Sequence, residues 1–138
     1  MSAETEVVLD TTILPALEKG GYTSHTGVDL GQRLGAVEYQ ADVAAEDKHG
    51  HKCLISLRWQ QVASADEEEV PFDAICLAEG ILDSGGEYSK AYLVLGGSGW
   101  SLREFFVGGG LSQHLRHADL VTIMTLEDFV AKANSGEL

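Results

Sequence analysis

The 138-residue chain is 44% hydrophobic and 22% charged, which is typical of a globular protein that buries its own core. Its 22 acidic residues outnumber nine lysines and arginines, and the net charge of −13 disfavours non-specific nucleic-acid binding, which depends on phosphate contacts. No run of about 18 apolar residues predicts a membrane span, and the N-terminal residues lack the basic and apolar regions of a signal peptide. We therefore expect one cytoplasmic domain over residues 1–138, without membrane contact.

The N-terminal part predicts a helix followed by an irregular segment. The stretch from Ser2 to Tyr22 has an imperfect apolar face, and Ser2 is the expected N-cap. Pro15 should kink or restart this helix, and the glycine pair at 20–21 should end it. Residues 22–35 show no clear period and are expected to be irregular.

Two strands follow, at residues 36–46 and 52–62, and the turn DKHGH between them predicts a hairpin. Gly50 is available for the left-handed position of that turn. If residues 48–50 form a three-residue loop, Asp47 pairs with His51.

Counting outward from that turn predicts which side chains share a face. Asp42 then lies opposite Ser56, and Gln40 lies opposite Arg58. A change of one residue in the loop would undo this register.

The rest of the chain alternates between helical and strand patterns. We expect, in order, an acidic loop at 65–70, a strand or helix at 71–82, a loop at 83–90, a buried strand at 91–97, a helix at 101–110 capped by Ser101, a strand at 119–125 and a helix at 126–136. This order predicts an α/β domain with a mixed sheet, in which an antiparallel hairpin joins strands linked by crossovers. Cys53 and Cys76 lie in apolar stretches and are expected to be buried free thiols.

The second hairpin strand, KCLISLRWQQ, carries a polar row on one side. Its other side is apolar and is expected to face the core: Cys53, Ile55, Leu57 and Trp59. Ser56, Arg58 and Gln60 form the polar row, and the predicted register adds Asp42 to it. Such a row can hold a hard cation through oxygen ligands, beside a charge that stabilises a reacting phosphate. The alternative is a structural Asp42–Arg58 ion pair on a solvated face of the sheet.

The segments EYQADVAAEDKHGHKCLISLRWQQ, EEEVPFDAICLAE and AYLVLGGSGW resemble small stand-alone domains of the PD-(D/E)XK nuclease superfamily. The resemblance implies the restriction-endonuclease-like fold, a mixed central β-sheet flanked by α-helices. Asp42 then matches the family's first aspartate, Ser56 the acidic position of the second motif, and Arg58 the family's lysine. Gln60 or Gln61 matches the glutamine that follows.

This resemblance implies a metal-dependent DNA phosphodiester nuclease that uses Mg²⁺ or Mn²⁺. Asp42 would bind the metal together with a glutamate of the first helix. Glu18 is the candidate for this second ligand, with Glu4 and Glu6 as alternatives. Arg58 would stabilise the transition state, and Gln60 would orient water or substrate.

Three departures from the family pattern favour a different reading. Ser56 is not an acid, and Arg58 stays protonated and cannot act as a general base. Glu69 stands where related domains tend to have a lysine. The alternative interpretation is a catalytically inactive domain of the same fold that needs no cofactor. Such a domain would act in protein association, with a basic partner or as a homo-oligomer. A small-ligand module built on the glycine-rich GGSGW turn is a third interpretation.

Overall fold

The computed structural model describes residues 3–138, so the expected N-cap Ser2 lies outside the described residues. The elements are α1 (Ala3–Val8), a π-helical segment (Leu9–Ile13), α2 (Leu14–Lys19), β1 (Thr23–Arg33), β2 (Val37–Glu46), β3 (Lys52–Trp59), α3 (Glu69–Leu82), β4 (Lys90–Gly96), α4 (Arg103–Val107), β5 (Val121–Thr125) and α5 (Leu126–Asn134). Short 3-10 turns occupy Ala65–Glu68, Gly110–Gln113 and Ala118–Leu120. Within residues 3–138, no helix combines the length and apolar character that a membrane crossing requires.

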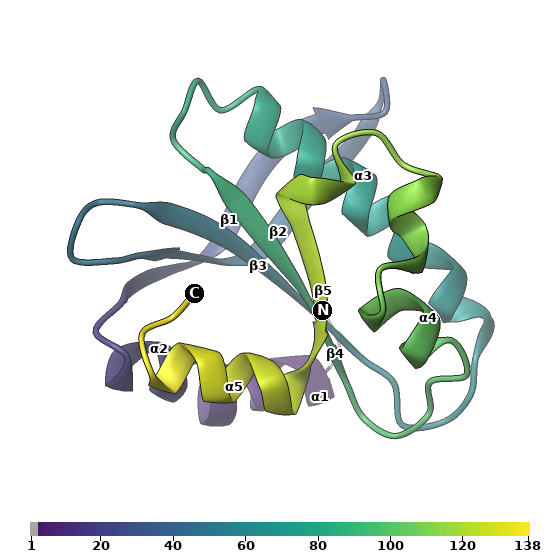
Figure 1. The fold of residues 1–138 in the computed structure, drawn as a ribbon, viewed down its shortest axis with the longest axis horizontal. Coiled ribbons are helices and arrows are strands. Elements are labelled where there is room, and N and C mark those ends of the chain that lie inside the picture. Colours follow the sequence, from purple (N-terminus) through teal and green to yellow (C-terminus); the bar gives the residue numbers. More distant parts are fainter. Residues whose placement is uncertain (1–2) are drawn as a thin grey trace.

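One five-stranded sheet runs through the molecule in the order β1-β2-β3-β4-β5. The β1–β2 and β2–β3 pairs are antiparallel, whereas β3–β4 and β4–β5 are parallel. Helices α1, α2 and α5 cover one face of this sheet, and α3 and α4 cover the other (Figure 1). The expected α/β architecture with a mixed, helix-flanked sheet is confirmed.

Each face of the sheet has its own hydrophobic core. Ile13, Leu17 and Phe129 pack from the helices against Ile55 and Val94 on one face. The core of the opposite face contains Val70, Leu77, Phe106, Leu54 and Leu93. Because β3 and β4 are covered on both faces, they show continuous apolar runs rather than alternation. The polar residues of β3 therefore lie in a strand that is largely enclosed.

Most of the segment 22–35, which was expected to be irregular, forms the strand β1 at Thr23–Arg33. β1 is an edge strand, so most of its side chains are exposed and need not be apolar. Its register also shifts between Asp29 and Gln32, where a bulge interrupts the pairing with β2. Both features remove the period-two signal on which strand prediction depends.

Residues 65–82 are helical throughout. The expected acidic loop becomes a 3-10 turn that leads directly into α3 at Glu69. Val70, Ala74, Leu77 and Ile81 are buried at helical spacing, which settles the ambiguity between strand and helix.

The two predicted helix starts have different outcomes. Pro15 lies in the first turn of α2, so the expected restart of the N-terminal helix is confirmed. Ser101 does not cap α4, which begins at Arg103. Instead, the buried Glu67 carboxylate accepts a hydrogen bond from the Leu102 N–H at 2.8 Å.

The GGSGW turn packs tightly against the end of β3. Gly97 has a φ of +88°, and a Cβ there would lie 2.7 Å from the Gln60 carbonyl carbon. Gly99 is similarly crowded by the backbone of Val62. The glycines of this turn are therefore explained by backbone packing.

Gly97→Ala should destabilise the protein more than Gly86→Ala. Both glycines have left-handed φ values, +88° and +91°, but no atom lies within 4 Å of the Cβ position at Gly86. Gly86→Ala should cost about 1 kcal/mol from backbone strain, and Gly97→Ala about 2 kcal/mol more from overpacking. Urea denaturation measures both changes, and equal losses would contradict the close approach at Gly97.

Candidate functional site: an acidic cleft at the split between β2 and β3

The hairpin register is confirmed close to the turn. The Asp47 N–H donates to the His51 carbonyl oxygen at 2.9 Å, and Gly50 has a φ of +84°. Pairing of β2 with β3 continues from Glu46 and Lys52 as far as Val43 and Ile55.

Beyond that pair the two strands separate, so the expected Asp42–Ser56 and Gln40–Arg58 pairs do not form. The Asp42 side chain replaces the missing backbone pairing: its Oδ2 accepts a hydrogen bond from the Leu57 N–H at 2.7 Å. Ala41 and Ala44 both pack in the α3-side core, which breaks the regular alternation of β2 at Asp42.

The split opens a cleft of about 390 Å³. The structure brings together in its wall four predicted residues: Asp42, Ser56, Arg58 and Gln60. Other polar and aromatic residues complete the wall, including Tyr39, Trp59, Asp66, Asp73 and Trp100. Trp59 was expected in the core with Leu57, but it is half-buried at the cleft.

Arg58 points toward α3 and is held there by two carboxylates one helical turn apart. Its Nε and Nη2 donate to the two oxygens of Asp73, the second at 3.1 Å, and its Nη1 donates to Glu69 Oε2 at 2.7 Å. This is the fork-to-fork geometry that arginine forms with carboxylates. The expected alternative of an Asp42–Arg58 pair is replaced by pairs with Asp73 and Glu69.

Asp73 is the most enclosed charge of the cleft. It is 3% exposed, and its Oδ1 also accepts a hydrogen bond from the Tyr39 hydroxyl at 3.2 Å. Burial and the neighbouring Asp73 charge raise the pKa of Tyr39, so this hydroxyl stays protonated and donates. Both Asp73 oxygens are therefore already engaged.

Asp42 lies in a less compensated environment. Burial raises the pKa of Asp42 above its ordinary value, although the hydrogen bond from Leu57 acts in the opposite direction. The ionised form is thus energetically costly in the folded protein.

Ser56 and Gln60 have contrasting roles. Ser56 is 5% exposed, and its hydroxyl makes no hydrogen bond of good geometry within the described residues, although its interaction with the Tyr39 hydroxyl partly offsets the rise in the pKa of Tyr39. Gln60 is also buried, but its Nε2 donates to the Gly99 carbonyl at 2.8 Å and ties the GGSGW turn to β3. Gln60 therefore has a structural role at the edge of the cleft.

The residues present do not fit the magnesium site that the family resemblance implies. Glu18 is exposed on α2 and does not line the cleft, and Glu4 and Glu6 are exposed on either side of the cleft residue Thr5. No group of three potential metal-ligating His, Cys, Asp or Glu side chains occurs within residues 3–138.

Sequence reasoning missed Asp73 and Tyr39. The spacing of Glu69 and Asp73 is the signal that could have found the ion pair, because residues four apart lie on one helical face. The apolar pattern of residues 71–82 suits a strand as well as a helix, so the sequence alone does not place Glu69 and Asp73 on one face.

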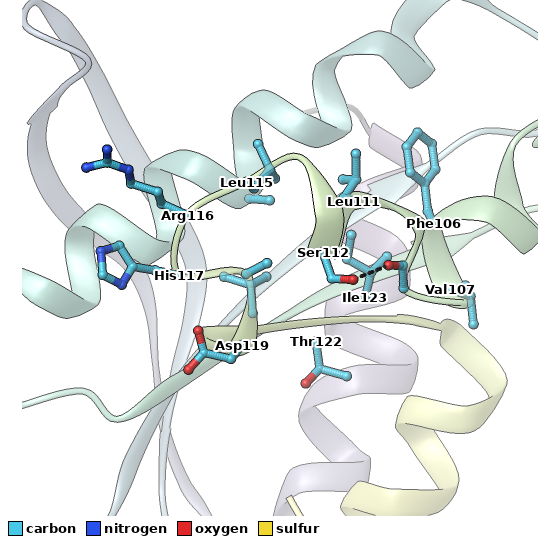
Figure 2. Close-up of a pocket in the computed structure, with 14 residues that line it drawn as sticks. Phe106, Val107, Leu111, Ser112, Leu115, Arg116, His117, Asp119, Thr122 and Ile123 are labelled. Atoms are coloured by element: carbon cyan, nitrogen blue, oxygen red, sulfur yellow. Dashed lines mark hydrogen bonds between the residues drawn. The ribbon is translucent and has the colours of Figure 1, made fainter.

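A second cavity, of about 230 Å³, lies between α4 and β5. Its interior is apolar, with Phe106, Leu111 and Ile123, and Arg116 and His117 lie at its edge (Figure 2). It contains none of the predicted site residues.

No protein-family model and no curated protein matches the chain. Among solved structures, the crystal structure of "Protein of Unknown Function AF1548" is similar, with a TM-score of 0.52 and 15% sequence identity. The match covers 82% of this chain and 54% of that one, so this chain spans about half the length of its structural neighbour. At this identity the likeness shows the fold alone, an α/β domain with a helix-flanked mixed sheet.

Arg58→Ala should destabilise the protein by about 3 kcal/mol, because it leaves the buried Asp73 carboxylate without its cation. Glu69→Gln is the matched control, since Glu69 is 57% exposed and its pair should contribute less than about 1 kcal/mol. Urea denaturation of both variants measures the difference. Similar losses for the two variants would contradict a dominant Arg58–Asp73 pair.

Asp42→Asn should stabilise the protein more near pH 7 than near pH 4. The raised pKa of Asp42 means that its stabilising contribution is complete below the unfolded-state pKa of about 3.9 and is lost as pH rises through the folded-state pKa. Asparagine removes this titration and keeps an oxygen for the Leu57 N–H. Thermal unfolding of the variant and the parent at both pH values tests this, and an equal gain at both would contradict it.

Proposed function

We propose that this chain is a restriction-endonuclease-like domain that does not cleave phosphodiesters and instead associates with a protein that has a basic surface. The carrying observation is the position of Arg58. The residue that matches the family's lysine is bound on three of its nitrogens by Asp73 and Glu69 of α3.

In this arrangement the Arg58 guanidinium is not available to bind a phosphate group. A phosphate approaching Arg58 would compete with two carboxylates, one of them buried, and would meet their negative charge. Ser56, at the position of the second acid, supplies no charge for a metal ion. Among the four residues that match the family motif, Asp42 alone is a carboxylate, whereas hard cations prefer several oxygen ligands.

The charge of the chain supports a basic partner. With −13 overall and the carboxylates of Asp42 and Asp66 in the cleft wall, the protein should attract positively charged surfaces. Association of two copies would bring like charges together, so a basic partner is favoured over a homo-oligomer.

A metal-dependent DNA nuclease is the second candidate. It is favoured by one observation, that Asp42, Ser56, Arg58 and Gln60 all line one cleft. In this alternative, Mg²⁺ or Mn²⁺ would be held by Asp42 and would supply the electrostatic stabilisation of the reacting phosphate.

A cleavage assay separates the two candidates. We expect that the purified protein leaves supercoiled plasmid and single-stranded oligonucleotides intact with Mg²⁺ or Mn²⁺, as does Asp42→Ala, because the cleft cannot assemble the required charges. Gel electrophoresis of the products gives the readout. Cleavage that requires the metal and disappears in Asp42→Ala would overturn the proposal in favour of the nuclease.

A further inference from the structure

Two polar groups of the cleft are left over once the Arg58 cluster is accounted for. Among residues 3–138, the Asp42 carboxylate accepts a hydrogen bond from the Leu57 N–H, and it lies in a buried environment. The Ser56 hydroxyl lines the same cleft, is 5% exposed and makes no hydrogen bond of good geometry within the described residues. A buried hydroxyl that forms only a poor contact, here with the Tyr39 hydroxyl, is costly, so a ligand that hydrogen-bonds to it would recover part of that free energy.

These two groups favour one kind of cation. An ammonium group is a compact point charge with three donors, which one carboxylate and one hydroxyl can share. A guanidinium prefers a carboxylate that accepts two bonds side by side, and Asp73 already gives that geometry to Arg58.

The aromatic part of the wall suits the stem of a lysine side chain. Trp100 is fixed by a hydrogen bond from its Nε1 to the Gly96 carbonyl at 2.8 Å, and Tyr39 is fixed through Asp73. Together with Trp59 they provide apolar surface for methylene groups and aromatic rings near a cation.

We infer that this cleft binds the ammonium group of a lysine side chain on the partner protein, an inference that rests on the proposed function. Asp42 forms an ion pair with the ammonium group, and the Ser56 hydroxyl accepts a hydrogen bond from it. The two tryptophans pack against the methylene groups of the lysine. Val7, which is 59% exposed, shares a shallow apolar hollow with Trp59. The partner's lysine should therefore have an apolar neighbour on that side.

The two tryptophans of the chain both line the cleft, so their fluorescence reports directly on binding. The probe is a blocked pentapeptide with one central lysine, compared with the same peptide carrying Nε-acetyl-lysine or arginine. We expect a saturable emission change with the lysine peptide, none with the acetylated peptide, and weaker binding of the arginine peptide. Equal responses to the lysine and acetyl-lysine peptides, or no response to either, would overturn the inference.

Three variants locate the effect. Asp42→Asn should weaken binding of the lysine peptide about tenfold, and Ser56→Ala should weaken it about threefold, through loss of a charged and a neutral hydrogen bond respectively. Asp10→Asn removes the same charge from an exposed residue outside the cleft and should leave binding unchanged. Equal weakening by Asp10→Asn and Asp42→Asn would show only general attraction to an acidic protein and would overturn the inference.

Two further outcomes separate the inference from the proposed function. If spermidine binds more tightly than the lysine peptide, the ammonium group comes from a polyamine and not from a partner protein, and the inference is overturned. If the protein neither binds the lysine peptide nor cleaves DNA, this inference fails while the loss of nuclease activity stands. Metal-dependent cleavage would overturn the proposed function itself.

Discussion

The contact between Arg58 and Asp73 sets the character of the whole cleft. Asp73 is a buried residue of α3, and a carboxylate in that position needs a cation and hydrogen bonds to remain ionised. Arg58 supplies both from β3, and Glu69 and Tyr39 complete the cluster. The pair therefore joins a helix to the strand beneath it and also decides where the guanidinium points.

This constraint has a chemical consequence. A side chain held by three donor contacts within the protein cannot also move to follow a reacting phosphate, and its charge is already balanced. What remains open toward the cleft is Asp42, with the Ser56 hydroxyl. With the Arg58 charge balanced, the groups that remain available to a ligand favour a cation over an anion.

The sequence predicted this site well where local rules apply and poorly where tertiary contacts decide. The hairpin register near Gly50 follows from turn chemistry, and the polar row of β3 follows from alternation. The break of alternation at Asp42 cannot be deduced from a period of two. Asp73 was missed because its apolar neighbours suit a buried strand as well as a helix. β1 was missed because exposed edge strands carry little hydrophobic signal.

Two features of the cleft oppose folding, and their coincidence is informative. An ionised Asp42 is disfavoured by burial, and the Ser56 hydroxyl is buried without a hydrogen bond of good geometry within the described residues, which is also unfavourable. Asp42 has a structural reason to be polar, because it accepts the Leu57 N–H hydrogen bond, but a buried hydroxyl at Ser56 has none, and the neighbouring Leu54 and Ile55 of β3 are apolar. Local costs of this kind gather at sites where a ligand compensates for them. The Asp42 carboxylate and the Ser56 hydroxyl, rather than the well-satisfied Arg58, are therefore the groups of the cleft that a ligand would stabilise most.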